Sequence, residues 1–150
     1  MGTSGNDQLV GAAGNDQMDG KSGDDRLDGG EGNDTLTAGG GADTLTGGNG
    51  ADVFVFNSLS ESSPGILNRD VITDFMPASG DRITLAAIDA VPAVDGDQAF
   101  RLISGDFTGE AGELRYADGL IQGDVQGDGG VDFEITLLGK PVLDASSFIL

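Results

Sequence analysis

The sequence predicts an all-β protein, in which a right-handed parallel β-roll is followed by a C-terminal, antiparallel, sandwich-like β layer that caps it. Three observations support this fold class. A nine-residue pattern repeats over residues 2–55, glycine supplies 27 of the 150 residues, and the remainder alternates short apolar runs with turn residues. We expect one compact unit with two parts, a roll over residues 2–56 and a capping region over residues 57–150.

The repeat consists of six nonapeptides that follow one another without a gap from Gly2 to Val55. Position four is always glycine, position six is always aspartate and position eight is always large and apolar. The position-six aspartates are Asp7, Asp16, Asp25, Asp34, Asp43 and Asp52, and the apolar residues are Leu9, Met18, Leu27, Leu36, Leu45 and Phe54. A disordered Gly/Asp linker is the alternative, but it would not keep an apolar residue at every ninth place.

This pattern resembles the G-G-x-G-x-D-x-U-x repeat of the RTX family, which binds calcium. In each copy the glycines permit a sharp turn that exposes backbone carbonyls, and the aspartate adds a carboxylate. Oxygen ligands without nitrogen or sulfur favour Ca²⁺ over zinc or copper. We therefore expect the six aspartates to bind Ca²⁺ together with turn glycines at positions two and four. These glycines are Gly5, Gly14, Gly23, Gly30, Gly32, Gly39, Gly41, Gly48 and Gly50.

Successive turns should lie on alternate edges of the roll, so that carboxylates one rung apart are about 4.8 Å from each other. Two such charges repel by roughly 3 kcal/mol at an effective dielectric constant near 20. A cation between them turns this repulsion into attraction. Four stacked pairs predict at least four calcium ions, between residues 7 and 25, 25 and 43, 16 and 34, and 34 and 52. Because the apolar interior is thin, we expect the repeats to be disordered without metal.

The overall composition excludes several classes of function. The net charge is −19, from 26 acidic and 7 basic residues, which repels nucleic acid and anionic membranes. Cysteine and histidine are absent, so thiolate sites, Ser-His-Asp triads and His-ligated zinc are excluded. No apolar run has transmembrane length, and residues 1–4 do not resemble an N-terminal signal peptide, so we expect no stable membrane insertion.

Beyond Phe56, six apolar runs separated by Gly/Asp turns predict short strands. They cover residues 70–75, 81–85, 99–103, 113–116, 120–122 and 133–137. The segments "GADVFVF", "DVITDF", "GDRITL", "FTGEAGELRY", "GDVQGDGGVDFEI" and "DASSFIL" resemble, in this order, the C-terminal domain of serralysin metalloproteases. The resemblance implies a covalently linked N-terminal catalytic domain, since this chain has no His-Glu-x-x-His motif. It also implies a further Ca²⁺ held by Glu61, Asp70 and Asp81; the alternative is that Asp70 and Asp81 cap turns.

Two acidic segments near the C-terminus have competing interpretations. Asp124 to Asp132 starts like an EF-hand loop, but Ile135 replaces the glutamate that such a loop requires, which favours a hairpin. The last residues, Asp144 followed by Phe148, Ile149 and Leu150, predict a terminal edge strand. The serralysin resemblance implies that they are also an uncleaved signal for a type I secretion ABC transporter.

The leading hypothesis is a non-catalytic, secreted bacterial module that passes unfolded through a type I transporter and folds on meeting extracellular calcium. The alternative is a Ca²⁺-dependent polysaccharide-binding module like those that accompany alginate epimerases. A third class, a carboxylate-based glycosidase, is disfavoured because few aromatic residues remain to line a sugar cleft.

Overall fold

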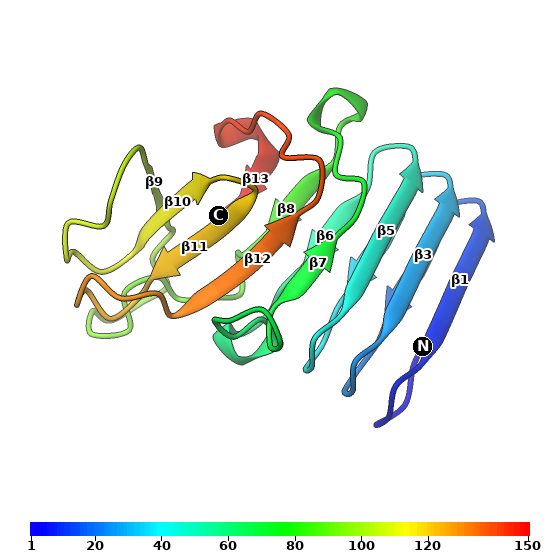
Figure 1. Cartoon of the computed structure of the whole chain (residues 1–150), viewed down its shortest axis with the longest axis horizontal. Helices are drawn as coiled ribbons and strands as arrows, with labels where there is room; N and C mark the ends of the chain where they lie inside the picture. The colour runs from blue at the N-terminus through cyan, green and yellow to red at the C-terminus, as the bar shows by residue number, and fades with distance from the viewer.

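The computed structural model describes all 150 residues as two β-sheets with three short 3-10 helices and no α-helix (Figure 1). The eight-stranded sheet contains, in spatial order, β1 (Gln8–Ala13), β3 (Arg26–Glu31), β5 (Thr44–Asn49), β7 (Asp70–Ile72), β12 (Phe133–Leu137), β11 (Leu120–Asp124), β10 (Glu113–Ala117) and β9 (Arg101–Ile103). The five-stranded sheet contains β13 (Phe148–Ile149), β8 (Arg82–Thr84), β6 (Val53–Val55), β4 (Thr35–Thr37) and β2 (Gln17–Asp19). The 3-10 helices are η1 (Leu59–Glu61), η2 (Pro77–Ser79) and η3 (Ala145–Ser147).

The six repeats form the predicted parallel β-roll, with consecutive repeats on opposite sheets. Repeats one, three and five supply β1, β3 and β5, while repeats two, four and six supply β2, β4 and β6. Every neighbouring pair within the roll is parallel and is shifted by 18 residues, as in Leu9↔Leu27 and Met18↔Leu36. The nine-residue period therefore places equivalent residues directly above one another.

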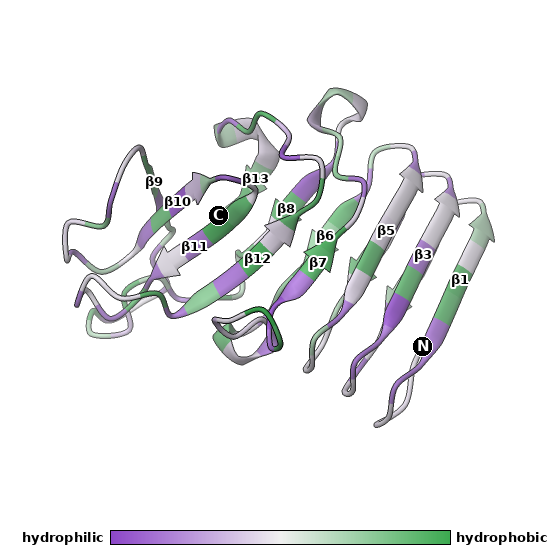
Figure 2. Cartoon of the chain, viewed as in Figure 1, coloured by the Kyte–Doolittle hydropathy of each residue, from purple (hydrophilic) through white to green (hydrophobic).

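The interior of the roll is a ladder of the position-eight side chains. Leu27, Leu36, Leu45 and Phe54 have no exposed surface, whereas Leu9 at the end of the ladder is only partly buried. Each fully buried side chain of this size contributes roughly 1.5–3 kcal/mol. Figure 2 shows the resulting apolar bands crossing the middle of β1, β3 and β5.

The C-terminal strands extend the two sheets of the roll. We expected a separate antiparallel layer over its end; instead β7 pairs with β5, and β8 pairs with β6, both in parallel. Only β10, β11 and β12 form an antiparallel meander, which joins β7 through β12. The physical reason is visible in the sequence: Asp70-Val71-Ile72 and Asp81-Arg82-Ile83 keep the Asp-x-apolar end of the repeat, and Ile72 and Ile83 are fully buried.

All six predicted C-terminal strand segments contain a strand of the structure. No helix of the protein combines the length and the apolar character needed to cross a membrane.

Candidate metal centre

Two columns of aspartates run along the two edges of the roll. In one column the backbone N–H of each aspartate donates to Oδ1 of the next, at 2.8 Å from Asp7 to Asp25, 2.7 Å from Asp25 to Asp43 and 2.7 Å from Asp43 to Asp70. The second column repeats this arrangement: Asp16 donates to Asp34, Asp34 to Asp52 and Asp52 to Asp81, at 2.8, 2.8 and 3.1 Å. Each column therefore has four members, and the last member lies beyond the nonapeptides.

The second carboxylate oxygen of most of these aspartates is buried and has no hydrogen-bond partner. The unpartnered atoms are Oδ2 of Asp16, Asp25, Asp34, Asp43, Asp52 and Asp70. A buried polar atom without a partner costs about 1–3 kcal/mol, and a charged one costs more. Six such atoms in two regular rows form a donor set that fits a row of cations along each edge.

Backbone carbonyls converge on the same oxygens. A Cβ at Gly11 would lie 2.6 Å from Asp16 Oδ2 and 2.6 Å from the carbonyl oxygen of Gly29, the equivalent glycine one rung further on. Gly20 lies in the same way beside Asp25 Oδ2, and a Cβ there would be 2.5 Å from the carbonyl oxygen of Ala38. Position one is glycine in five of the six repeats, where the space beside it is lined by oxygen atoms, and Ala38 in repeat five is the exception.

The predicted glycine ligands at positions two and four lie where each turn stacks on the turn one rung earlier. Gly32 has φ of +124° and Gly50 has φ of +138°, which L side chains rarely adopt. A Cβ at either residue would collide with the carbonyl of the glycine one rung earlier. These glycines therefore let the turns approach closely, and their role as ligands stays a prediction.

Burial and mutual repulsion raise the pKa values of five column carboxyls, those of Asp25, Asp43, Asp52, Asp70 and Asp81. Desolvation, reinforced by the charges of Asp25 and Glu61, raises the pKa of Asp43 to about 6. Desolvation, reinforced by Asp43 and Glu61, raises the pKa of Asp70 to about 8. The pKa values of Asp25 and Asp52 are also raised, again mainly by burial. A cation among these groups would restore their charged forms.

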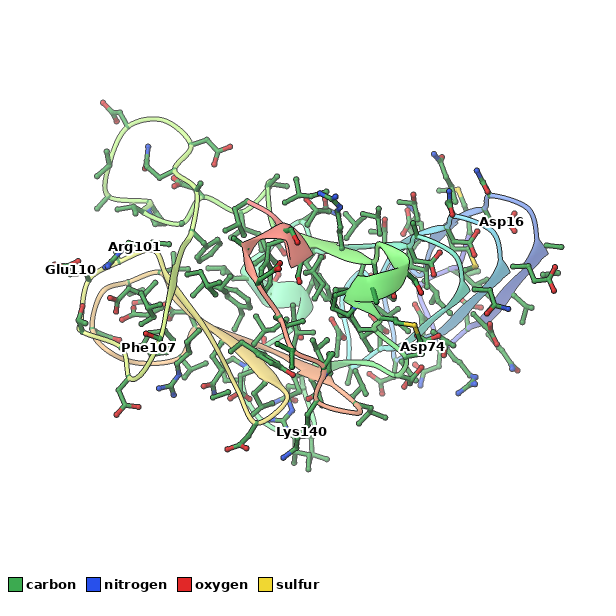
Figure 3. All side chains as sticks on the ribbon, turned by 90° about the horizontal axis from the view of Figure 1, so that it is seen from above. Asp16, Asp74, Arg101, Phe107, Glu110 and Lys140 are labelled. Carbon is green, nitrogen blue, oxygen red and sulfur yellow. The ribbon has the colours of Figure 1, made fainter.

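At two ends of the columns, Oδ2 of the aspartate accepts hydrogen bonds from protein donors. Asp7 Oδ2 accepts hydrogen bonds from Thr3 N at 2.6 Å and Thr3 Oγ1 at 2.9 Å. Asp81 Oδ2 accepts one from Met76 N at 2.8 Å. Beside the second column, the Asp74 carboxylate accepts from the amides of Gly47 and Gly48 at 2.9 and 2.8 Å. Figure 3 places Asp74 on the same side of the molecule as Asp16, far from Arg101 and Glu110.

Glu61, Asp70 and Asp81 do not form a common three-carboxylate site. Asp70 belongs to the column of Asp43 and Asp81 to that of Asp52, on strands of different sheets. Glu61 accepts a hydrogen bond from Asn57 N at 2.8 Å, and nowhere do three carboxylates converge on one metal position. The expectation of a single shared ion is therefore corrected, because the two aspartates continue opposite edges of the roll.

The segment from Asp124 to Asp132 connects the antiparallel strands β11 and β12, so the hairpin interpretation is confirmed. The carboxylate of Asp124 accepts from Gly127 N at 2.6 Å and Gly129 N at 2.8 Å, and that of Asp132 accepts from Val125 N at 2.7 Å. Because backbone amides already occupy these carboxylates, the loop has the contacts of a turn and not those of a metal site.

The C-terminal residues form the predicted edge strand. Asp144 caps η3 by accepting a hydrogen bond from Ser146 N at 2.8 Å, and Phe148 and Ile149 then pair in parallel with β8. The additional role of Asp144 to Leu150 as an export signal stays a prediction.

Comparisons with known proteins agree with this geometry. The family model described as "RTX calcium-binding nonapeptide repeat (4 copies)" matches residues 1–27 and 19–54. No curated protein sequence matches the chain significantly. Among solved structures, the AlgE6R3 subunit of the Azotobacter vinelandii mannuronan C5-epimerase is 31% identical, with a TM-score of 0.68 over 99% of this chain and 80% of that chain. The AlgE6R2 subunit is 26% identical, with a TM-score of 0.67 over 97% and 88%.

These relatives support the calcium-binding repeat, but they do not support the serralysin type in particular. The match extends over the roll and the C-terminal strands alike. The chain therefore belongs to the family of RTX calcium-binding nonapeptide repeat proteins.

Proposed function

We propose that this chain is a non-catalytic module whose two aspartate columns hold at least four calcium ions between stacked turns, and that these ions make the roll fold. The observation that carries the proposal is the row of buried Oδ2 atoms without partners. The ligands proposed are the carboxylates of Asp7, Asp16, Asp25, Asp34, Asp43, Asp52 and Asp70, with turn carbonyls completing each shell. Since apolar burial in the roll is thin, much of its folding free energy would come from metal binding.

A calcium titration of the chelated protein tests this proposal. β-sheet circular dichroism should rise with calcium, and calorimetry should count at least four ions. Asp34→Asn should lower the count and the calcium affinity, because Asp34 Oδ2 is one of the unpartnered atoms. Asp28→Asn is the matched control, since Asp28 lies on the outer face of β3, outside both aspartate columns. A structure that ignores calcium, or an equal effect of both variants, would contradict the proposal.

The wider role that we propose is export and calcium-triggered folding of a longer bacterial protein. A chain with a net charge of −19 repels itself at low calcium and passes unfolded through a type I transporter. Extracellular calcium at millimolar concentration then suits the weaker affinities of extracellular sites. Removing residues 144–150 should abolish export by such a transporter while leaving the calcium-dependent fold of residues 1–143 largely in place. Unchanged export of the shortened chain would contradict the proposal that residues 144–150 are an export signal.

A second candidate function is calcium-dependent polysaccharide binding. It is favoured by one observation, that both structural relatives described above are subunits of a mannuronan C5-epimerase. The negative charge of the chain opposes direct contact with a polyanion, so bound calcium would have to bridge the two. Calorimetry with uronate oligomers in calcium separates the two candidates. A heat of binding with a defined stoichiometry supports polysaccharide binding, and the absence of heat contradicts it.

A further inference from the structure

The two aspartate columns end in different surroundings at the C-terminal side of the roll. Asp43 N–H donates to Asp70 Oδ1 at 2.7 Å in one column, and Asp52 N–H donates to Asp81 Oδ1 at 3.1 Å in the other. Asp70 and Asp81 are buried, with exposed fractions of 0% and 4%. Neither residue belongs to a nonapeptide, so the surroundings of its second carboxylate oxygen determine how its column is closed.

The end of the second column is closed by the protein itself. Asp81 Oδ2 accepts a hydrogen bond from Met76 N–H at 2.8 Å, so both oxygens of this carboxylate have a backbone donor. Asp74, a neighbouring acidic residue, is likewise held by the amides of Gly47 and Gly48. A cation at Asp81 would have to displace the Met76 N–H, which would lose its hydrogen bond.

The end of the first column has no such donor. Asp70 Oδ2 is buried and accepts no hydrogen bond, and neither does Oδ2 of Asp43 one rung earlier. The charge of Glu61 lies close enough to raise the pKa values of both aspartates. Arg69, which precedes Asp70 in the chain, pairs instead with Glu134 at 2.9 Å. Three acidic groups are therefore close to one another here without a basic partner.

Given the calcium binding proposed above, we infer that Asp70 binds an ion in addition to those at the four stacked pairs of the nonapeptides, and that its counterpart Asp81 binds none. The buried oxygen of Asp70 is a hard, charged ligand, and Glu61 beside it adds negative charge that favours a divalent cation. An ion here compensates a carboxylate oxygen that otherwise lies buried without a partner.

Asp70 also lies at the junction between the roll and the meander. Its N–H donates to Ser62 Oγ at 2.8 Å, and Ser62 Oγ donates in turn to the carbonyl oxygen of Glu134 in β12. The carbonyl of Ser62 accepts the N–H of Glu134 at 3.0 Å, and Asp70 is the register partner of Ile135. β12 lies beside β7 in Figure 1. A cation that fixes Asp70 therefore also stabilises the docking of β12 on β7.

Calcium calorimetry on the whole chain compares Asp70→Asn with Asp81→Asn, a matched control at the same position of the other column. Asn keeps the size of the side chain and still accepts the N–H of the preceding rung. Asp70→Asn should bind one ion fewer than the wild type, whereas Asp81→Asn should bind as many ions as the wild type. Glu61→Gln should keep the number of ions and lower the affinity of one of them by roughly threefold or more.

Hydrogen exchange in calcium tests the link to the meander. The amides of Glu134 and Leu138 donate across the junction, to the carbonyls of Ser62 and Ile72, each at 3.0 Å. They should exchange roughly tenfold faster in Asp70→Asn than in the control variant, because no ion then fixes the side chain at this junction. The amides of the nonapeptides should stay protected in both variants. Equal exchange of the junction amides in the two variants would contradict the link.

Circular dichroism in calcium shows whether each variant folds. An ion count unchanged by Asp70→Asn, in a protein that still needs calcium to fold, would overturn this inference and leave the proposed function standing. Loss of an ion from Asp81→Asn would overturn it as well. If Asp70→Asn does not fold, Glu61→Gln decides, and calcium affinities equal to those of the wild type would refute the inference. A wild type that folds without binding calcium would contradict both the inference and the proposed function.

Discussion

The roll and the C-terminal meander bury carboxylates in opposite ways. In the roll, six Oδ2 atoms are buried without any partner. In the meander, Glu113 is fully buried but accepts hydrogen bonds from Thr108 N and Oγ1, both at 2.7 Å, and from Arg101 at 2.9 Å. Glu134 likewise accepts from Gly65 N and from Arg69, each at 2.9 Å. The protein thus supplies donors to the buried carboxylates of the meander and supplies none to the six Oδ2 atoms of the roll.

The largest expected effect comes from filling the space beside one column. Gly29→Ala places a methyl group against Asp34 Oδ2 and 2.5 Å from the carbonyl oxygen of Gly47. We expect weaker calcium binding and a loss of roughly 3 kcal/mol of stability in calcium, because the methyl group overpacks a space lined by oxygen atoms. Calorimetry and denaturant unfolding measure both quantities. Gly40→Ala is the control, because a Cβ there meets nothing within 4 Å; equal losses in the two variants would disprove the explanation.

A change in the meander should destabilise the protein without affecting calcium. Glu113→Gln removes the charge that Arg101 pairs with and disturbs the hydrogen bonds from Thr108. The expected loss is about 2–3 kcal/mol, typical of a hydrogen-bonded charge. Urea unfolding should show the same loss at low and at saturating calcium, and the number of bound ions should not change. A lower ion count would mean that the two regions are not independent.

The calcium-free protein should lose residual structure as the pH rises. The pKa of Asp43 is raised to about 6 and that of Asp70 to about 8, both from an ordinary value of 3.8. Between about pH 4 and pH 8 the folded form therefore binds more protons than the unfolded chain, so its stability falls as the pH rises through this window. Thermal unfolding in chelator from pH 5 to pH 8 measures the trend, and calcium affinity should rise over the same range. A melting temperature that increases with pH in chelator would refute this.

The smallest expected effect concerns the strained backbone at the end of the roll. Ala12 has φ of 81°, a conformation that costs an L residue roughly 1 kcal/mol and glycine much less. Ala12→Gly should therefore raise the unfolding free energy by about 0.5–1 kcal/mol in calcium. Gly30→Ala, the reverse change one rung further on, should destabilise, since its Cβ meets the carbonyl of Ala12. Destabilisation by Ala12→Gly would show that the strain is not significant.

Much of the roll could be predicted because every rung repeats one local rule. The position-six aspartates, the inward apolar residues and the alternation between edges all follow from a period of nine. Two consequences of stacking were not predicted: the role of position five, and the continuation of the aspartate columns beyond the repeats. Position five is Asn or Asp in repeats one to four, where its side chain accepts the position-five N–H of the next rung, as Asn15 does from Asn33 at 2.9 Å. It becomes Ala42 and Ala51 in the last two repeats, where no regular turn follows.

The continuation of the columns through Asp70 and Asp81 was also missed as a stacking feature, because the intervening turns are longer than those of the repeat. The Asp-x-apolar triplets at 70–72 and 81–83 were the signal that could have revealed it. The partners of Glu113 and Glu134 were beyond sequence reasoning, since they depend on loops that meet only in the folded chain. We propose that residues 2–56 and 57–150 form one compact unit in calcium, since both sheets cross this boundary.

Hydrogen exchange with and without a chelator tests the central claim most directly, because it reads both regions in one sample. If cations bind the column carboxylates, removing calcium should make the amides of residues 20–56 exchange rapidly. The amides of residues 113–137 should then exchange distinctly more slowly than those of residues 20–56. If the roll amides stay as protected in chelator as in calcium, the buried aspartates do not need a cation, and the account is wrong.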